Sequence, residues 1–238
     1  MNRIVQLFLL SLLALSLTFC NEVKEVIEPH TWTILPQEEG KYRILQVWDT
    51  TFNTAGISQP EVDIYYKKEE LGGEEVDLLN RPIRLINVYR SDLDLGTNYE
   101  FQIDRVWSQF IDPQSGTDYF AERIEENDRI LILKFPVSTG ISWNGNLFND
   151  RQVGTGIFEY GDTDTTVVIQ GMSFDNCVMV IHSADTNNLI NNRFAYEIYA
   201  PEIGLIKKYD KTIVNDGPNG EFNSSKSRIY IEEIIEHN

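Results

Sequence analysis

Cys20 is the side chain whose setting most clearly predicts a chemical reaction. It follows an apolar run from Ile4 to Leu17, which begins directly after the positive charge of Arg3. This run is shorter than the ~20 residues that a helix needs to cross a membrane, and it is typical of an export signal. We expect the thiol of Cys20 to be lipidated and to anchor the protein to a membrane.

A second cleavage site competes with processing at Cys20. Leu17 suits a lipobox, in which cleavage precedes the cysteine, whereas Phe19 stands where Gly, Ala or Ser is usual. Ordinary signal peptidase would instead read the small residues of Ala14-Leu15-Ser16. Asn21 replaces the Asp that retains many lipoproteins in the inner membrane, so it favours the outer membrane of a Gram-negative envelope.

These signals divide the chain into three parts. We expect a signal peptide over residues 1–19, a polar lipid-anchored tether over 20–30 and a single β domain over 31–238. The last part is long enough for one large core, and no linker rich in Pro, Gly or Ser divides it.

Cys177 is the other thiol of the chain. The apolar residues Val178-Met179-Val180-Ile181 follow it, as expected for a buried strand in which cysteine acts as a small hydrophobe. A reactive thiol needs a nearby base and electropositive surroundings. His182 is five positions away and would therefore lie on the opposite face of the strand. With Cys20 lipidated, no intrachain disulfide is available, so we expect Cys177 to be unreactive.

Neither a metal site nor a cofactor is predicted. Zinc needs clustered ligands, and His30, His182 and His237 are scattered along the chain. Asp162-Thr163-Asp164 and the stretch 144–150 offer oxygen ligands, but neither follows a calcium-loop pattern. Because Asn, Asp and Gly favour turns, turn formation explains both stretches more simply.

The chain also lacks a recognisable catalytic motif. No nucleophile elbow, phosphate loop or dinucleotide fingerprint is present. The 37 acidic residues make some carboxylate pair suited to glycoside hydrolysis inevitable, so such a pair carries no information. We therefore expect no catalytic residue and no enzyme activity. The four tryptophans either line a glycan or lipid cleft or fill the core: Trp32, Trp48, Trp107 and Trp143.

The charge of the chain limits the classes of partner. Lys and Arg number 20 against 37 Asp and Glu, which gives a net charge of −17. Such a balance argues against nucleic acid and against direct adhesion to anionic lipid head groups. A cationic partner fits this charge, as does a simple contribution to solubility.

Period-two alternation recurs along the chain, and helical periodicity does not. In the stretch 61–67, for example, Val62, Ile64 and Tyr66 alternate with polar neighbours, as in a strand with one face on a core. Further strands are expected at 42–48, 83–89, 99–104, 130–135, 156–160, 165–171, 177–182, 194–199, 204–209 and 229–234.

Short polar segments are expected to separate these strands. Residues 161–164 and 187–192 are predicted as hairpin connections, Gly72-Gly73 as a turn, and 216–226 as a longer loop. Residues 117–126 suit a helix or a strand equally well. We predict an all-β fold with at most one or two short helices, in which a large antiparallel sheet curls into a half-open barrel or a sandwich.

Three segments resemble an uncharacterised family of exported bacterial lipoproteins. Phe135–Gly145 resembles its "P…G..W.G" element, Ser173–Val178 its "tFdnv" strand entry, and Tyr199–Tyr209 its "YAPGVGLVK" signature. The family is similar in architecture to the half-open barrels of Lol-type lipoprotein carriers. Glu202 departs from the Gly that is common in the signature, so a different turn is expected there. The resemblance brings no catalytic residues.

The function expected from these observations is binding without catalysis. We predict an envelope lipoprotein whose β domain binds an apolar or amphipathic ligand, with ligand-binding residues that the sequence does not identify. One alternative is an acidic interaction module or accessory subunit that binds an envelope protein in an outer-membrane assembly. Another is a glycan-processing hydrolase.

Overall fold

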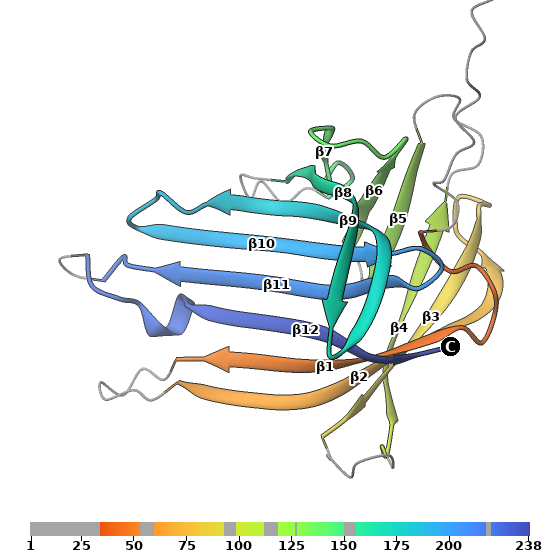
Figure 1. Cartoon of the computed structure of the whole chain (residues 1–238), viewed down its shortest axis with the longest axis horizontal. Coiled ribbons are helices and arrows are strands. Elements are labelled where there is room, and N and C mark those ends of the chain that lie inside the picture. The colour runs from red at the N-terminus through yellow and green to blue at the C-terminus, as the bar shows by residue number, and fades with distance from the viewer. Residues whose placement is uncertain are drawn as a thin grey trace, which may run out of the picture. The chain divides into compact units, whose positions relative to one another are not determined.

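The computed structural model describes residues 34–52, 60–92, 99–111, 119–126, 128–149, 156–217 and 220–238. Twelve strands form one antiparallel sheet in the order β6-β5-β4-β3-β2-β1-β12-β11-β10-β9-β8-β7 (Figure 1). The strands are β1 Tyr42–Thr51, β2 Glu61–Val76, β3 Pro82–Ser91, β4 Gln102–Ile111, β5 Tyr119–Glu125, β6 Asp128–Phe135, β7 Ser142–Asn144, β8 Ile157–Ile169, β9 Met172–Asp185, β10 Asn191–Ala200, β11 Gly204–Val214 and β12 Arg228–His237.

The described residues contain no α-helix, and their helical content is the 3-10 turn η2 at Ser224–Lys226. The all-β prediction is therefore confirmed, and residues 119–125 are a strand. The predicted signal peptide at 1–19, Cys20, the predicted tether at 20–30 with His30, and Trp32 lie outside the described residues. Within the described part of the chain, no helix is long and apolar enough to span a membrane.

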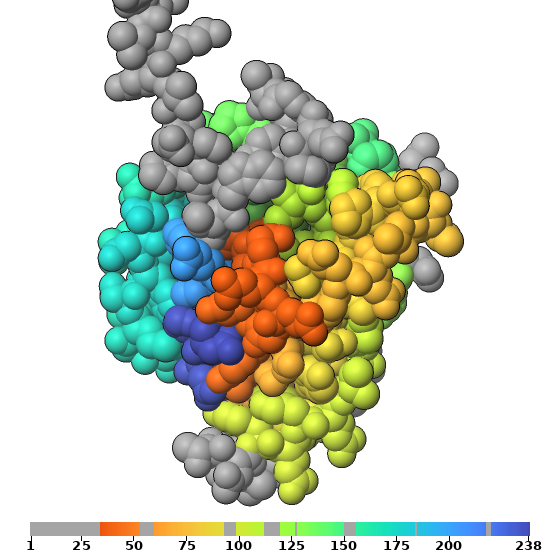
Figure 2. All heavy atoms as spheres, turned by 90° about the vertical axis from the view of Figure 1, so that its right-hand side faces the viewer, coloured from red at the N-terminus to blue at the C-terminus, as the bar shows by residue number. Residues whose placement is uncertain are grey.

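The first and last strands are neighbours in the sheet. β1 pairs with β12 from Arg43↔His237 to Thr51↔Arg228, and with β2 along its whole length. Figure 2 shows the start of the described chain, in red-orange, directly beside its blue C-terminal end. This pairing joins the sheet halves β2–β6 and β7–β11, so the fold depends on contacts between the two ends of the chain.

The curled sheet brings its edge strands together along a seam closed largely by side chains. The Nε1 of Trp143 donates to the carbonyl of Leu131 at 2.7 Å. The side chain of Asn149 accepts from the N–H of Arg129 at 3.0 Å and donates to its carbonyl at 2.8 Å. An unpaired edge strand is a template for aggregation, and these contacts satisfy the edge of β6 without a neighbouring strand.

Tyr160 continues the same seam. Its hydroxyl accepts from the N–H of Lys134 at 2.9 Å and donates to the carbonyl of Lys134 at 2.6 Å. One backbone bond, from the N–H of Leu131 to the carbonyl of Gly145 at 2.8 Å, crosses the seam as well. The sheet is thus a nearly closed barrel with one seam that lacks a regular ladder, in agreement with the predicted half-open barrel.

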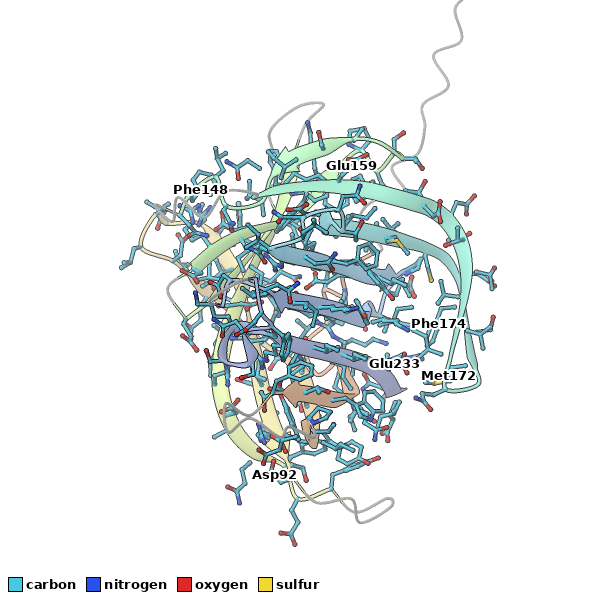
Figure 3. The ribbon with its side chains drawn as sticks, turned by 90° about the vertical axis from the view of Figure 1, so that its left-hand side faces the viewer. Asp92, Phe148, Glu159, Met172, Phe174 and Glu233 are labelled. Carbon is cyan, nitrogen blue, oxygen red and sulfur yellow. The ribbon has the colours of Figure 1, made fainter. Side chains whose placement is uncertain are left out.

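Two large apolar clusters stabilise the barrel. The first lies at the seam and joins β5 and β6 to β7–β11. The second forms where the far end of the β8–β9 hairpin packs against β1, β10, β11 and β12. Figure 3 shows this hairpin curving over the sheet, with Met172 and Phe174 near Glu233 of β12. The buried members of the second cluster are Leu45, Ile169, Phe174, Cys177, Ile198, Ala200, Ile206 and Ile234.

Two predicted turns are wrong. Residues 161–164 lie inside β8, where the pairing with β9 shifts register three times between Tyr160 and Val167. Gly72-Gly73 lies inside β2, where the register against β3 shifts between Leu71 and Glu74. Gly and Asp residues therefore mark β-bulges that bend long strands at these positions, and do not mark chain reversals. The predicted connection at 187–192 matches the one between β9 and β10 except for Asn191 and Asn192, which begin β10, and the predicted loop at 216–226 lies between β11 and β12.

Candidate functional site

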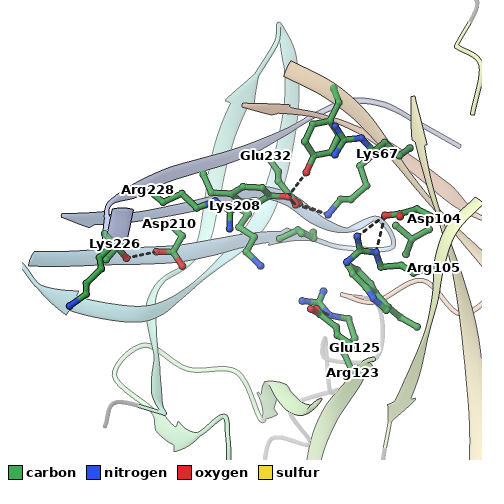
Figure 4. Close-up of a pocket in the computed structure, with 17 residues that line it drawn as sticks. Lys67, Asp104, Arg105, Arg123, Glu125, Lys208, Asp210, Lys226, Arg228 and Glu232 are labelled. Carbon is green, nitrogen blue, oxygen red and sulfur yellow. Dashed lines mark hydrogen bonds and ion pairs between the residues drawn. The ribbon is translucent and has the colours of Figure 1, made fainter. Parts of the chain in front are cut away.

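A cavity of about 560 Å³ lies between strands β2–β5 and strands β11–β12 of the curled sheet (Figure 4). Tyr65, Trp107 and Tyr230 are its aromatic lining residues. Seven lining side chains are basic and four are acidic. The basic ones are Lys67, Arg90, Arg105, Arg123, Lys208, Lys226 and Arg228, and the acidic ones are Asp104, Glu125, Asp210 and Glu232.

Strand alternation places these residues on one face. Every second residue of β11 from Lys208 to Thr212 lines the cavity, and so does every second residue of β12 from Arg228 to Glu232. The register puts Lys208 opposite Glu232, and Asp210 opposite Tyr230. Unlike charges and polar groups therefore lie side by side across the two strands, within reach of each other.

Buried ion pairs connect the deep part of the cavity to its walls. The ammonium of Lys67 lies 2.6 Å from Glu232 and 2.8 Å from Glu69, and Glu69 also contacts Arg43. Burial alone would raise the pKa of Glu69, but the charges of Arg43 and Lys67 hold that pKa well below its usual range. Glu69 is therefore ionised and serves as a fixed counter-charge.

A second buried carboxylate, Glu197, lies behind the cavity on β10. Its Oε1 is 3.1 Å from Lys208, its Oε2 is 3.5 Å from His182, and it accepts the hydroxyl of Tyr199. Burial would raise the pKa of Glu197, but nearby Lys208 keeps it well below its usual range. Burial lowers the pKa of His182 to about 4, so this imidazole is neutral at pH 7 and stacks on Phe158.

Two arginine–tyrosine pairs meet on the cavity wall. The guanidinium of Arg90 lies 3.7 Å from the centre of the Tyr65 ring, and that of Arg228 lies 4.9 Å from the centre of the Tyr230 ring. The two tyrosine hydroxyls are 3.4 Å apart. Tyr230 also donates to Glu232 at 2.5 Å, which joins the arginine–tyrosine pairs to the buried ion pairs.

Each basic side chain of the lining has a carboxylate partner within hydrogen-bonding or ion-pair distance. Arg228 contacts Asp49 at 2.5 Å, and Arg90 contacts Asp63 at 2.9 Å. The other five pairs are Lys67–Glu232, Arg105–Asp104, Arg123–Glu125, Lys208–Glu197 and Lys226–Asp216. The positive charges of the lining are thus balanced by carboxylates, of which Asp49, Asp63, Glu197 and Asp216 lie outside the lining.

Trp107 on β4 lines the cavity with an unused donor. Its side chain is buried, and its indole N–H has no hydrogen-bond partner among the described residues. The charged ends of Lys67 and Arg123 lie 5.6 Å and 5.4 Å from the centre of its ring. Because an unpaired buried donor costs free energy, a ligand acceptor at this point would be favourable.

The arrangement is suited to hydrogen bonding with a polar ligand. Ionised, paired carboxylates such as Glu69 and Glu197 are poor general acids at neutral pH. The described residues contain no group of three or more His, Cys, Asp or Glu side chains that could hold a metal ion.

The residues singled out in the sequence lie apart from one another. Cys177 is fully buried in the cluster beneath the β8–β9 hairpin, and burial raises its pKa to about 11. It is therefore the buried strand residue that was predicted. His237 contacts Phe174, with ring centres 5.9 Å apart. Of the tryptophans, Trp107 lines the cavity, whereas Trp143 closes the seam.

The sequence segments that resemble a family have structural roles. The first supplies Trp143 and Gly145 of the seam. The third is a hairpin turn between β10 and β11, with Glu202 at φ 62° and Gly204 at φ 82°. The carbonyl of Ile203 in this turn accepts from Arg43 at 2.9 Å, which holds Arg43 beside Glu69.

The cavity residues themselves were not identified from the sequence. The alternation of residues 61–67 placed Lys67 on the face of its strand that lies in water, and it gave no role to Arg228 or Glu232. One feature of the sequence indicates these residues. Arg228, Tyr230 and Glu232 are polar at every second position of the last strand, and residues 208–212 are polar at the same spacing. That feature identifies a shared face only when the strand order is known.

Comparisons with known proteins give little further information. No family model matches the chain, and no curated protein matches it. The chain is similar to a solved protein from Bacteroides fragilis that is described as exported and as having a YmcC-like fold. The identity is 10% and the TM-score is 0.36, over 86% of this chain and 99% of the other. A similarity at this level carries no argument about function.

Proposed function

We propose that this protein is a non-enzymatic lipoprotein of the bacterial outer membrane that binds an amphipathic ligand in the barrel cavity. The observation that supports this function best is the cavity of about 560 Å³, a volume typical of small-molecule sites. The apolar segment before Cys20 and the absence of a catalytic motif from the sequence also favour it.

An amphipathic ligand fits the cavity better than a wholly apolar one. Burying an alkyl chain against paired charges such as Lys67 and Glu232 would remove water from them without replacing its hydrogen bonds, which is costly. Val88, Trp107 and Leu205 supply an apolar contact area in the same cavity. A ligand with one polar and one apolar part would satisfy both kinds of surface.

Native mass spectrometry of the full chain tests this function. The protein would be purified gently from an exporting Gram-negative host and again after incubation with an envelope lipid extract. We expect a retained small-molecule adduct that is lost on denaturation. A bare polypeptide mass under both conditions would contradict ligand binding.

The anchor is tested separately by the mass of the denatured protein. We expect cleavage before Cys20 and a mass increase that corresponds to a lipid group. The Cys20→Ser variant should lack this increase and leave the membrane fraction. Equal masses and equal membrane association of the two proteins would contradict lipidation.

A further inference from the structure

We infer that the polar part of the ligand is an uncharged saccharide, held through its hydroxyl groups by the ion-paired side chains of the cavity. This inference rests on the proposed function, because it assigns a chemical class to the ligand of the same cavity. It follows from the pairing of the charges, from the donors that remain unused, and from the aromatic residues between them.

The pairing of charges disfavours a charged head group. Arg228 is held by Asp49 through its Nε and Nη2, and Arg90 is held by Asp63 and Asp92. An anion next to these arginines would meet the carboxylates behind them, and a cation would meet the guanidinium groups. Basic side chains outnumber acidic ones on the lining itself, and the carboxylates of Asp49, Asp63, Glu197 and Asp216, which lie outside the lining, balance this surplus.

A hydroxyl group, in contrast, matches such pairs directly. It donates one hydrogen bond and accepts two, so a single sugar hydroxyl can accept from an arginine and donate to its carboxylate partner. Three basic residues of the lining have a carboxylate partner that also lines the cavity: Lys67 with Glu232, Arg105 with Asp104, and Arg123 with Glu125. A ligand that carries many hydroxyls can use several pairs at once without leaving a charge unbalanced.

Several donors remain unused in the structure. The Nη1 groups of Arg90 and Arg228 have no hydrogen-bond partner among the described residues, since both arginines use Nε and Nη2 for their carboxylates. The indole N–H of Trp107 is buried without a partner in the same part of the chain. These donors belong to residues that line one cavity, together with Tyr65 and Tyr230, and such a lining favours a ligand rich in acceptors.

A series of three amphiphiles tests the inference. Dodecyl maltoside, dodecyl phosphate and dodecyltrimethylammonium share one alkyl chain and differ in head group: an uncharged disaccharide, an anion and a cation. Binding to the full-length protein would be measured by titration calorimetry below the micellar concentrations. We expect the maltoside to bind at least about tenfold more tightly than the other two, a difference of roughly 1.4 kcal/mol.

The salt dependence gives a second readout. Binding through neutral hydroxyls should change less than about twofold between roughly 50 and 500 mM NaCl, whereas binding of a charged head group should weaken strongly. Tighter binding of the phosphate or the ammonium compound would overturn the saccharide assignment but leave the proposed function intact. Absence of binding by all three would contradict both.

Two conservative variants locate the binding site. Trp107→Phe removes the unpaired N–H and keeps an aromatic ring, so it should weaken maltoside binding by about fivefold or more. Some loss of thermal stability is expected as well, because a smaller ring replaces a buried indole. Tyr230→Phe should weaken binding similarly, with some loss of stability because Tyr230 also donates to Glu232.

Tyr209→Phe is the matched control, because Tyr209 lies on β11 between the lining residues Lys208 and Asp210 and so faces away from the cavity. Maltoside affinity in this variant should equal that of the wild type. If Trp107→Phe and Tyr230→Phe both fold and bind the maltoside as tightly as this control, the saccharide assignment to this cavity is wrong.

Discussion

At the scale of single residues, the hairpin turn between β10 and β11 contains an unusual backbone conformation. Glu202 has φ 62°, in the left-handed region that side chains other than glycine disfavour. The turn also positions the Ile203 carbonyl that binds Arg43, so its geometry supports the buried ion pair between Arg43 and Glu69. Glutamate thus adopts a conformation typical of glycine at this position, at a cost in backbone strain.

Glu202→Gly should stabilise the protein. A left-handed conformation costs a residue with a side chain about 1–2 kcal/mol, and the greater flexibility of glycine in the unfolded chain offsets about 0.4–1 kcal/mol of this. We expect a net increase of about 1 kcal/mol in the free energy of unfolding, measured by urea denaturation. Glu202→Ala is the control and should give no increase, because alanine meets the same backbone strain.

His182 should make the stability depend on pH. Its pKa is about 4 in the folded protein, below the value of about 6.5 expected in the unfolded chain. The unfolded chain therefore binds more protons between these values, and the free energy of unfolding falls as the pH decreases from about 6.5 to about 4. The loss should reach at most about 3 kcal/mol.

The variant His182→Gln isolates this contribution. Urea denaturation of both proteins at several pH values should show that the variant lacks the additional loss of stability between pH ~6.5 and ~4. Parallel pH profiles of the wild type and the variant would show that His182 does not titrate as described.

At the scale of elements, three polar side chains close the seam between the two edge strands of the sheet. Trp143 and Asn149 lie in and after the short strand β7, and Tyr160 lies in β8. All three bind backbone groups on the free edge of β6. Side chains thus perform the role of a neighbouring strand where the two ends of the sheet meet.

Tyr160→Phe should weaken the seam. The substitution removes the hydroxyl that binds both the N–H and the carbonyl of Lys134, and it leaves these backbone groups without that partner. We expect the free energy of unfolding to fall by about 1–3 kcal/mol. Hydrogen exchange of the β6 amides should also become faster, whereas that of the central strands should change little.

Tyr196→Phe serves as the control, because the Tyr196 ring packs on Phe194 and Tyr209 and no hydrogen bond of its hydroxyl is found among the described residues. Its stability should stay within about 0.5 kcal/mol of the wild type. Equal effects of the two substitutions would contradict a role for the Tyr160 hydroxyl in closing the barrel.

At the scale of the whole molecule, the β8–β9 hairpin has two parts with different neighbours. Near its base, β9 pairs with β10 and continues the sheet. After the register shifts around residues 161–166, its far end bends away and packs on β1, β11 and β12. Phe174 is buried in this second cluster, so the hairpin connects strands that are distant in the sheet order.

Phe174→Ala should therefore destabilise the whole barrel. Removing a buried phenylalanine typically costs about 3–5 kcal/mol, through the lost transfer free energy and the cavity left behind. Phe222→Ala is the comparison, because Phe222 is 45% exposed and its removal should cost less than about 1 kcal/mol. Thermal unfolding that is equally affected in both variants would show that the second cluster contributes little.

The strands were predictable from the sequence, because alternation is a local property. Residues 194–199 lie in β10 as predicted, although Ala195, Glu197 and Tyr199 of the opposite face are buried and Phe194 and Tyr196 only partly so. Ten further predicted stretches lie wholly or partly in strands of the structure. Gly72 and Gly161 were misinterpreted as turn residues, since a β-bulge and a turn use the same residue types.

Which face of each strand lines the cavity depends on how the strands are arranged in the folded protein. Lys67 and Glu232 are separated by 165 positions, yet they form a buried ion pair. An alternating pattern reports that two faces differ, but it cannot report that a polar face turns inward. That outcome depends on the curling of the sheet and on the pairing of β1 with β12, which are set by contacts between distant parts of the chain.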